Sequence, residues 1–339
     1  MTSSTVRWGI LGCGNIAHKF AAGLQAVDHA NSYAAASRSF ERAVAFAERH
    51  RFERAYGSYR ELVEDPDLDI VYIATPHTYH YAHARLCLEH GKAVLCEKPF
   101  TMNRGQLDYL VSLARERGIF MMEALWSRFL PGILRVKELL EEGLLGKIVG
   151  MDADFGIRAP YDPKSRLYDP YLGGGALLDI GIYPVFLSLF LFGLPHSHKA
   201  LSSLNGHRND LSTSVIFQYA NGLLTNLRST ILADTLVEAT IFGKLGTLTI
   251  NRLWFTPTPV TVQLTGKKKE ILKFPPLVNG YEYEAMEATQ CMLSGQTESS
   301  VIPHSFSLEL MELLDGIRRE TGISYPPEVE SIEYPYGGI

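Results

Sequence analysis

The first third of the chain alternates short apolar runs with longer amphipathic segments. Buried strands are indicated by the apolar runs at residues 6–11, 32–37, 68–76, 93–96 and 119–124. Helical spacing follows the first four, at residues 15–26, 40–50, 79–91 and 105–118. Repeated strand–helix units with fully apolar strands predict an α/β fold, a Rossmann-type doubly wound parallel sheet over residues 1–124.

After about residue 125 the pattern changes to that of an antiparallel sheet. Strand-like alternation covers residues 212–232, 238–255 and 260–274, and helical patterns flank it at 131–142, 281–293 and 304–320. Within the first of these segments, Asn221-Gly222 is a dipeptide typical of hairpin turns. Residues 125–339 are therefore predicted to form an α+β domain with an open, mainly antiparallel sheet.

Composition excludes several classes of protein. The 339 residues are 46% hydrophobic and 20% charged, which is ordinary for a soluble protein with two cores. A net charge of −5 without a long basic run argues against nucleic acid as a partner. The 4 cysteines show no CxxC spacing and the N-terminal segment lacks a signal-peptide pattern, so we expect a cytoplasmic location. Residues 177–193 are strongly apolar but contain Asp179 and Pro184, so we expect a core helix and no membrane association.

A glycine-rich turn joins the first predicted strand to the first predicted helix. It has the dinucleotide fingerprint GxGxxG with alanine in its last place, Ala17. Gly12 allows the tight turn, Gly14 lets the backbone approach a pyrophosphate, and the helix N-terminus attracts the anion. Glycines also serve simple turns, but at the start of a βαβ pattern they predict a dinucleotide site. The predicted contacts are Gly12, Cys13, Gly14, Asn15 and Ile16.

The end of the second predicted strand indicates which dinucleotide binds. NAD-binding chains usually place an acid there, for the ribose hydroxyls. Here the positions hold Ser37 and Arg38, with Arg42 one helical turn later. A hydroxyl and guanidinium groups suit a 2′-phosphate, so NADP is predicted and NAD is the second choice. The alternative is a solvated arginine that begins a helix.

Histidines follow the buried strand at residues 68–76. His77, His80 and His83 are three residues apart, which suggests a metal site, but no Cys, Asp or Glu joins them locally. We predict no metal. Because ligands bind beyond the carboxyl ends of parallel strands, Thr75, Pro76, His77 and His80 are predicted to contact the cofactor or substrate. His83 is expected at the surface.

Two charged residues end the next buried strand. Glu97 and Lys98 follow the apolar residues 93–96, and Pro99 stiffens the turn. A charged pair at the end of a buried strand is costly unless it is used. Lys98 is predicted to stabilise an alkoxide or carbonyl oxygen, and Glu97 to hold the lysine or the cofactor ribose. The alternative is an ion pair that caps the strand.

A second cluster lies at residues 173–185, where three glycines precede an apolar helix. Asp179 and Tyr183 are four residues apart and are therefore expected on one helical face. They are either satisfied polar groups of the core or active-site residues opposite Lys98.

These motifs together resemble the glucose–fructose oxidoreductase/inositol dehydrogenase/MocA (Gfo/Idh/MocA) family. The fingerprint, "EKP" at 97–99 and "GGGALLDIGIY" at 173–183 carry the resemblance, which covers essentially the whole chain. "AVLCEKPF" and "MEALWSRF" are most similar to its branch of dimeric dihydrodiol dehydrogenases and NADP-linked D-xylose 1-dehydrogenases. Many members carry His where this chain has Tyr183, which makes inositol a less suitable substrate.

The resemblance implies an NADP-dependent oxidoreductase acting on a sugar, cyclic polyol or dihydrodiol. Tyr183 would transfer the proton, Lys98 would assist it and Asp179 would bind substrate or orient Lys98; the reverse assignment, with Lys98 transferring the proton, stays open. Trp126 and Arg128 would border the nicotinamide, and the substrate pocket would include Trp126, Phe155 and Trp254. A homodimer through the C-terminal sheet is also implied. The alternative function is a non-catalytic NADP-binding sensor or regulatory protein on the same fold.

Overall fold

The computed structural model describes residues 5–333, which form two compact units. The first contains the chain up to Trp126, Leu277–Leu308 and a segment that begins at Pro327. The second contains Ser127–Pro276 and Glu309–Pro326. The sequence prediction assigned all residues after 124 to the second domain. In the structure, two later segments, Leu277–Leu308 and the one that begins at Pro327, belong to the first unit.

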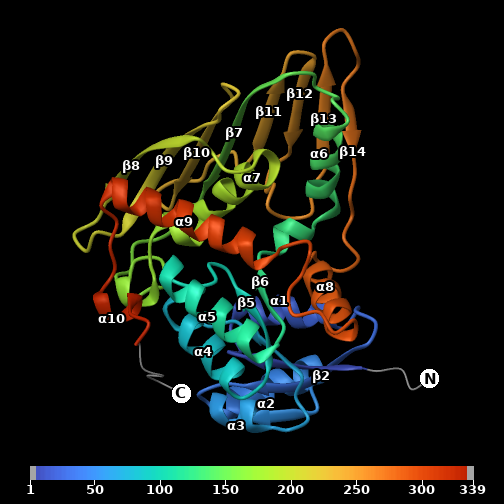
Figure 1. The fold of residues 1–339 in the computed structure, drawn as a ribbon, viewed down its shortest axis with the longest axis vertical. Helices are drawn as coiled ribbons and strands as arrows, with labels where there is room; N and C mark the ends of the chain where they lie inside the picture. Colours follow the sequence, from blue (N-terminus) through green and yellow to red (C-terminus); the bar gives the residue numbers. More distant parts are fainter. Residues whose placement is uncertain (1–4, 334–339) are drawn as a thin grey trace. The chain divides into compact units, whose positions relative to one another are not determined.

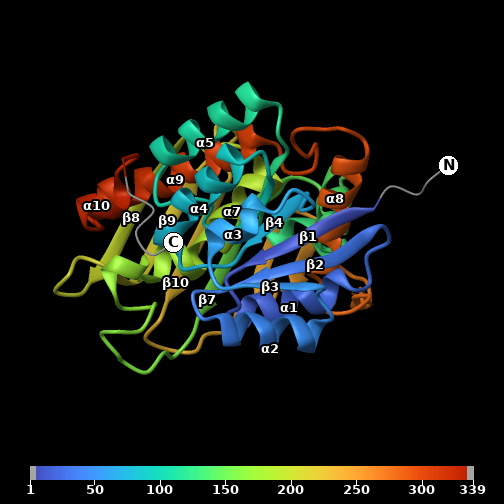
Figure 2. The same ribbon diagram turned by 90° about the horizontal axis from the view of Figure 1, so that it is seen from below.

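The first unit is built on a six-stranded sheet with helices on both faces. Its strands are β1 (Val6–Leu11), β2 (Ala30–Ala36), β3 (Arg54–Tyr56), β4 (Ile70–Ile73), β5 (Ala93–Glu97) and β6 (Met121–Ala124). They are all parallel, in the order β3-β2-β1-β4-β5-β6. The helices are α1 (Asn15–Leu24), α2 (Phe40–His50), α3 (Tyr59–Glu64), α4 (His77–Glu89) and α5 (Arg104–Arg117). Figure 2 shows α1 and α2 on one face and α4 and α5 on the other, which confirms the doubly wound sheet.

Specific contacts bring a late segment of the chain back to this unit. The indole Nε1 of Trp8 in β1 donates to Oγ1 of Thr289 in α8 (Glu282–Leu293) over 3.3 Å. A β-carbon on Gly23 of α1 would lie 2.8 Å from the backbone nitrogen of Glu282, so α1 and α8 touch at backbone distance. The amide of Gln106 donates to the carbonyl oxygen of Val329 in α10 (Pro327–Glu330) over 3.0 Å. Contacts between residues so distant in sequence leave no periodic signal.

The second unit is built on an eight-stranded sheet in the order β14-β13-β12-β11-β7-β10-β9-β8. Its strands are β7 (Ile148–Gly156), β8 (Ser197–Leu204), β9 (Asp210–Gln218), β10 (Leu224–Thr230), β11 (Ala239–Gly243), β12 (Gly246–Ile250), β13 (Val260–Leu264) and β14 (Glu270–Leu272). All neighbours are antiparallel except β7 and β10, which are parallel. The predicted α+β domain with a mainly antiparallel sheet is confirmed.

Three helices accompany this sheet. α6 (Pro131–Glu141) and α7 (Ile182–Phe192) belong to the second unit, and α9 (His304–Thr321) contributes its part from Glu309 onward. α7 packs against β7 and β10 (Figure 1).

Among the described residues one helical stretch, Pro170–Phe192, is long and apolar enough to cross a membrane, and 89% of its most apolar window is buried inside the protein. Such burial is the environment that a core helix requires.

The expected surface position of His83 is wrong. The side chain is 3% exposed, and its Nδ1 lies 3.0 Å from Oγ1 of Thr75. Its ring packs against the rings of Tyr59 and Tyr79, with centroid distances of 4.9 and 5.9 Å. Burial lowers the pKa of His83 to about 3. Histidine spacing along α4 does not reveal this burial: Tyr79 lies one turn earlier in the same helix, but Tyr59 comes from α3.

Acid should therefore destabilise the first unit through His83. The folded protein holds this imidazole neutral, with a pKa of about 3, whereas the unfolded chain takes up a proton near pH 6.5. Its contribution to the free energy of unfolding is present above pH 6.5 and is lost as the pH falls, by about 2 kcal/mol at pH 5. Urea unfolding at pH 7 and pH 5 measures this loss.

His83→Gln should reduce the difference in the free energy of unfolding between pH 7 and pH 5 by about 2 kcal/mol, because glutamine does not titrate. His207→Gln, at an exposed position of the second unit, is the matched control and should leave the difference unchanged. An identical pH effect in His83→Gln and the unmodified protein would contradict the assignment.

Candidate active site

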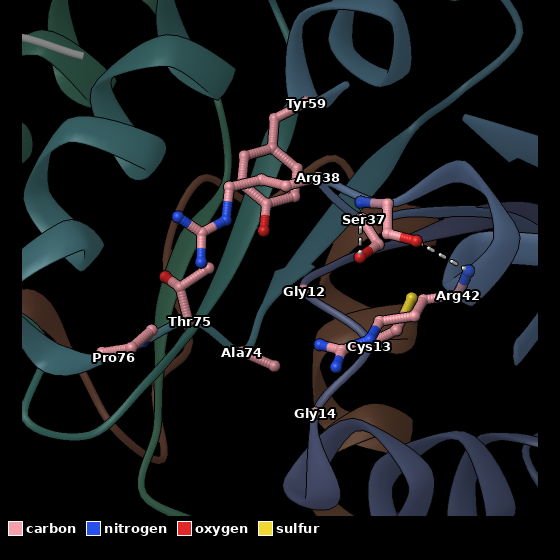
Figure 3. Close-up of a pocket in the computed structure, with 11 residues that line it drawn as sticks. Gly12, Cys13, Gly14, Ser37, Arg38, Arg42, Tyr59, Ala74, Thr75 and Pro76 are labelled. Atoms are coloured by element: carbon pink, nitrogen blue, oxygen red, sulfur yellow. Dashed lines mark hydrogen bonds between the residues drawn. The ribbon is translucent and has the colours of Figure 1, made fainter. Parts of the chain in front are cut away.

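A cavity of about 550 Å³ opens where β1, β2 and β4 end (Figure 3). Its volume lies within the range that small-molecule and cofactor sites occupy. The order of the strands reverses between β1 and β4, which is where ligands bind in doubly wound sheets. The cavity is lined by Gly12, Cys13, Gly14, Ser37, Arg38, Ser39, Arg42, Tyr59, Ala74, Thr75 and Pro76.

The glycine turn of this cavity fits a pyrophosphate. Gly12 has a φ of 98°, and a β-carbon there would lie 3.1 Å from the carbonyl oxygen of Ala74. Gly14 precedes α1 and provides no side-chain cap, and the first turn of α1 has no acidic residue. The N–H groups at the start of α1 therefore suit an anion. Cys13 lies in the same turn, and burial raises the pKa of its thiol to about 12, so it is an unreactive part of the wall.

The positive charge of the cavity comes from β2 and α2. Figure 3 shows the guanidinium of Arg42 beside the glycine turn and that of Arg38 next to Thr75, on the other side of the cavity. Both side chains are exposed, and within residues 5–333 neither guanidinium is ion-paired with a carboxylate. The backbone N–H of Arg42 donates to Oγ of Ser39, which caps α2. Arg42 is thus held at the cavity by a capped helix, and Arg38 lies just before that cap.

Two of the predicted residues after β4 line this cavity and two do not. Thr75 and Pro76 are wall residues, whereas His77 and His80 are buried in α4. The ring nitrogens of His80 lie 2.8 Å from the carbonyl oxygens of Thr75 and Pro99. A neutral imidazole donates to only one of these oxygens, and a second proton on His80 would let it donate to both. Burial opposes this protonation and lowers the pKa of His80 to about 4.

His80 connects the cavity wall to the turn that carries Lys98. Its contacts are to backbone, so direct contact with a cofactor stays a prediction for His77 and His80. Among residues 5–333, no group of three His, Cys, Asp or Glu side chains is arranged to hold a metal ion.

Glu97 and Lys98 occupy the end of β5. The Glu97 side chain is buried, and its carboxylate accepts hydrogen bonds from the Tyr72 hydroxyl and from the backbone N–H of Lys98. Burial raises the pKa of Tyr72 well above its usual value, so this phenol remains a donor to the acid. Lys98 is only partly buried and joins Pro99 through a cis peptide bond. The strand therefore ends in a fixed buried acid followed by a lysine that reaches solvent.

A second buried acid supports the same turn. Glu123 in β6 accepts hydrogen bonds from the backbone N–H of Phe100 at 3.2 Å and from Oγ of Ser307 at 2.6 Å. Burial raises the pKa of this carboxyl to about 7. Glu123 and Tyr72 are residues that the sequence analysis missed. An acid inside the apolar run at residues 119–124 was the available signal for Glu123.

In the second unit, Asp179 lies in a π-helical turn, Leu177–Gly181, that leads into α7. Its side chain is almost fully buried, and its Oδ1 accepts a hydrogen bond from Nη1 of Arg166 at 2.7 Å. π-Helical turns often occur at functional sites, because they change the direction in which side chains point. Arg166 was also missed, since it lies in an irregular segment without any periodic pattern.

Aromatic side chains surround Tyr183 at the start of α7. Its ring centroid is 5.2 Å from that of Phe255 and 5.6 Å from that of Phe155, and those two rings stack at 4.2 Å. Trp254 meets Tyr183 edge-on at 6.4 Å but is fully buried, and its Nε1 donates to the carbonyl oxygen of Asp154. The structure thus brings both Phe155 and Trp254 into contact with Tyr183, but the fully buried Trp254 is less accessible than Phe155 and Phe255.

The two predicted residues after β6 have different surroundings. Trp126 stacks on Tyr281 with 4.3 Å between ring centroids, within the first unit. The guanidinium of Arg128 lies 3.8 Å above the ring of Phe190, within the second unit. Their placement beside a nicotinamide stays a prediction.

The two units together hold the residue types of a hydride-transfer enzyme. The first unit has a cavity with a dinucleotide-type glycine turn and two guanidinium groups, and it carries Lys98 at the same edge of the sheet. The second unit has Asp179 and Tyr183, of which the phenol lies on an aromatic surface. A lysine cation and a phenol are groups that can stabilise an oxyanion and move a proton.

Known proteins share both units. A model described as an oxidoreductase family with an NAD-binding Rossmann fold matches residues 6–124, and the GFO/IDH/MocA C-terminal domain matches residues 133–249. The trans-1,2-dihydrobenzene-1,2-diol dehydrogenase of Xenopus tropicalis is 36% identical over 330 residues, which cover 94% of this chain and 99% of the relative. The protein of that name from Homo sapiens is 35% identical over 337 residues, covering 95% and 99%.

A solved structure is similar over the same range. A 3-ketoreductase from Actinomadura kijaniata, in complex with NADP and TDP-benzene, matches with a TM-score of 0.85 and 29% identity, covering 94% of this chain and 98% of that one. The two matching family models and the near full-length relatives show that the chain belongs to the Gfo/Idh/MocA family of oxidoreductases.

Proposed function

We propose that this oxidoreductase transfers a hydride between NADP and a hydroxyl-bearing carbon of a sugar, cyclic polyol or dihydrodiol. The observation that carries the proposal is the cavity that combines the Gly12 turn with the guanidinium groups of Arg38 and Arg42. Relatives named as dihydrodiol dehydrogenases and a ketoreductase solved with NADP support it.

The preference for NADP over NAD follows from charge. The 2′-phosphate is the group that distinguishes the two dinucleotides, and Arg38 and Arg42 extend into the cavity without carboxylate partners in the described part of the chain. Guanidinium–phosphate hydrogen bonds are strong and often bidentate. Ser37 stands where an NAD-binding chain usually carries an acid, so no negative charge from that position opposes the phosphate.

Lys98 and Tyr183 are the proposed proton-transfer pair. The bound nicotinamide supplies the hydride acceptor or donor. During oxidation the phenolate of Tyr183 takes the proton of the substrate hydroxyl and becomes the phenol, and in the reverse direction the phenol returns that proton. A lysine cation nearby favours the phenolate and stabilises an oxyanion. The ketoreductase has also been solved with a lysine replaced by alanine or glutamate and with a tyrosine replaced by phenylalanine, the same two residue types.

Asp179 and the aromatic side chains provide the substrate surface in this proposal. Asp179 is held by Arg166 at 2.7 Å, which fixes its carboxylate. Phe155 and Phe255 stack beside Tyr183, so the phenol lies on an apolar surface. An apolar surface with a few polar groups suits the C–H faces and hydroxyls of a ring-shaped diol or sugar.

The same chain is proposed to form a homodimer through the second sheet. Alternation along β9 and β10 leaves one face exposed, with Ile216 at 46% and Leu224 at 44% exposed, and Leu236 nearby at 72%. A hollow of about 490 Å³ on this face also contains Arg228 and Glu238. An apolar face with both signs of charge can pair with its own copy about a two-fold axis.

Arg38→Asp should change the cofactor preference. Replacing a guanidinium with a carboxylate removes a phosphate ligand and repels the 2′-phosphate, so the Kd for NADP should rise by about tenfold or more, while that for NAD falls or stays constant. Calorimetric titration with both dinucleotides measures the two constants. Lys19→Asp makes the same charge change at an exposed position of α1 outside the cavity and should alter neither. Equal affinity of the unmodified protein for NADP and NAD would remove the basis of the assignment.

Tyr183→Phe should lower kcat by about 10²- to 10⁴-fold and leave the Kd for NADP unchanged. Phenylalanine keeps the packing against Phe155 and Phe255 but has no proton to transfer. Nicotinamide absorbance with a panel of aldoses, inositols and trans-dihydrodiols measures the rate. Tyr219→Phe, which removes a buried phenol bonded to Ser188 in the same unit, should retain the rate. Normal turnover in Tyr183→Phe would assign the proton transfer to Lys98, and no turnover of the unmodified protein on any of these substrates would favour a sensor.

Leu236→Lys should convert the proposed dimer to a monomer, because it places a charge on the apolar face. Sedimentation equilibrium measures the mass in solution. Leu277→Lys makes the same change at a leucine of the first unit with similar exposure, 66% against 72%, and should leave the dimer intact. A monomer for the unmodified protein would refute this interface.

A further inference from the structure

The helix that carries Asp179 and Tyr183 begins without a cap from its own segment. Neither Ala176, before the π-helical turn, nor Gly181, before α7, provides a side-chain acceptor. The first N–H groups of a helix have no partner within the helix, so they need acceptors from elsewhere. Here the turn is fully buried, and water therefore does not serve this purpose.

Asp210, the first residue of β9, supplies that acceptor. Its Oδ2 accepts hydrogen bonds from the backbone N–H of Leu177 at 2.8 Å and from Oγ1 of Thr213 at 2.7 Å. The carboxylate is fully buried and comes from a strand 33 residues further along the chain. An acid at a helix N-terminus also interacts favourably with the helix dipole.

The neighbouring residue holds the glycine loop before the helix. The amide of Asn209 donates to the carbonyl oxygen of Gly174 at 2.6 Å, and Asn209 is also fully buried. Gly175 has a φ of 133°, and a β-carbon there would lie 2.6 Å from Oδ1 of Asp210. The loop thus rests directly on the carboxylate. Asn209 and Asp210 together fix a carbonyl before the helix and an N–H at its start.

Helix register decides where Asp179 and Tyr183 point. In an α-helix a shift of one residue rotates a side chain by about 100°. The π-helical turn at Leu177–Gly181 is a further irregularity that has to be held at one place. We propose that Asp210, with Asn209, is a positioning residue of the reaction: by binding the start of this helix it sets the direction of the Asp179 carboxylate and the Tyr183 phenol. The inference rests on the proposed roles of those two side chains.

Burial is unfavourable for the ionised form of the Asp210 carboxyl. Among the described residues, Oδ1 of Asp210 has no hydrogen-bond partner. Burial raises the pKa of Asp210 to about 6, above the usual value of 3.8. Because the folded state binds this proton more tightly, the stability that Asp210 contributes is present at low pH and is lost as the pH rises through about 6.

The test compares Asp210→Ala, which removes the acceptor, with Asp210→Asn, which keeps an oxygen for the Leu177 N–H. Ser188→Ala is the control, because Ser188 is buried in α7 and bonded to Tyr219 and Thr225, away from the start of the helix. The measurements are kcat, KM, unfolding by urea, and hydrogen exchange of the peptide that covers residues 176–183.

Asp210→Ala should lower kcat by about 10- to 100-fold with little change in KM. It should also speed exchange at residues 176–183 by about tenfold or more. Asp210→Asn should restore most of kcat and should unfold no more easily than the unmodified protein. Ser188→Ala should lower stability without changing kcat.

Two outcomes overturn the inference. One is a loss of stability in Asp210→Ala with unchanged kcat and unchanged exchange at 176–183. The other is an Asp210→Asn variant that keeps normal exchange but loses kcat as fully as Asp210→Ala. If the unmodified protein has no NADP-dependent turnover, the proposed function fails, and hydrogen exchange alone then decides: faster exchange in Asp210→Ala but not in Ser188→Ala supports the helix-positioning role, and equal exchange refutes it.

Discussion

The common direction of the parallel strands is the constraint on which the site depends. Because β1, β2, β4 and β5 are parallel neighbours, the turns that follow them gather at one edge of the sheet. That edge brings together Gly12, Arg38, Thr75 and Lys98, which are widely separated in the sequence. If any of these strands ran in the opposite direction, its functional residue would lie at the far edge.

Buried acids hold the turns in place. Glu97 accepts the backbone N–H of Lys98, Glu123 accepts that of Phe100, and Asp210 accepts that of Leu177. Each acid is buried next to a segment that carries a proposed catalytic side chain. A buried carboxylate costs free energy unless hydrogen bonds compensate it. In this protein the compensating donors include backbone N–H groups of the active-site turns, so contacts that satisfy the acids also restrain those turns.

The architecture and the cofactor cavity could be predicted from the sequence because their signals are local. Apolar runs of one strand length followed by helical spacing identify a doubly wound sheet, and the glycine turn and Arg38 are adjacent to predicted strand ends. Asn221-Gly222 likewise placed a hairpin where β9 and β10 pair.

The remaining features depend on contacts between distant segments. Asp210 reaches Leu177 from β9, Arg166 reaches Asp179 from an irregular loop, and Thr289 reaches Trp8 from α8. His83 was expected at the surface because Tyr59, which covers one side of its ring together with Tyr79 of the same helix, comes from α3. A single sequence contains no pattern that links such pairs.

A crystal structure with NADP and a slowly reacting substrate analogue tests the central claim most directly. The account predicts the 2′-phosphate between the guanidinium groups of Arg38 and Arg42, and Nζ of Lys98 and the Tyr183 hydroxyl within about 3.2 Å of one substrate oxygen. A 2′-phosphate bound away from both arginines, or a lysine and a phenol that do not reach the same oxygen, would contradict it.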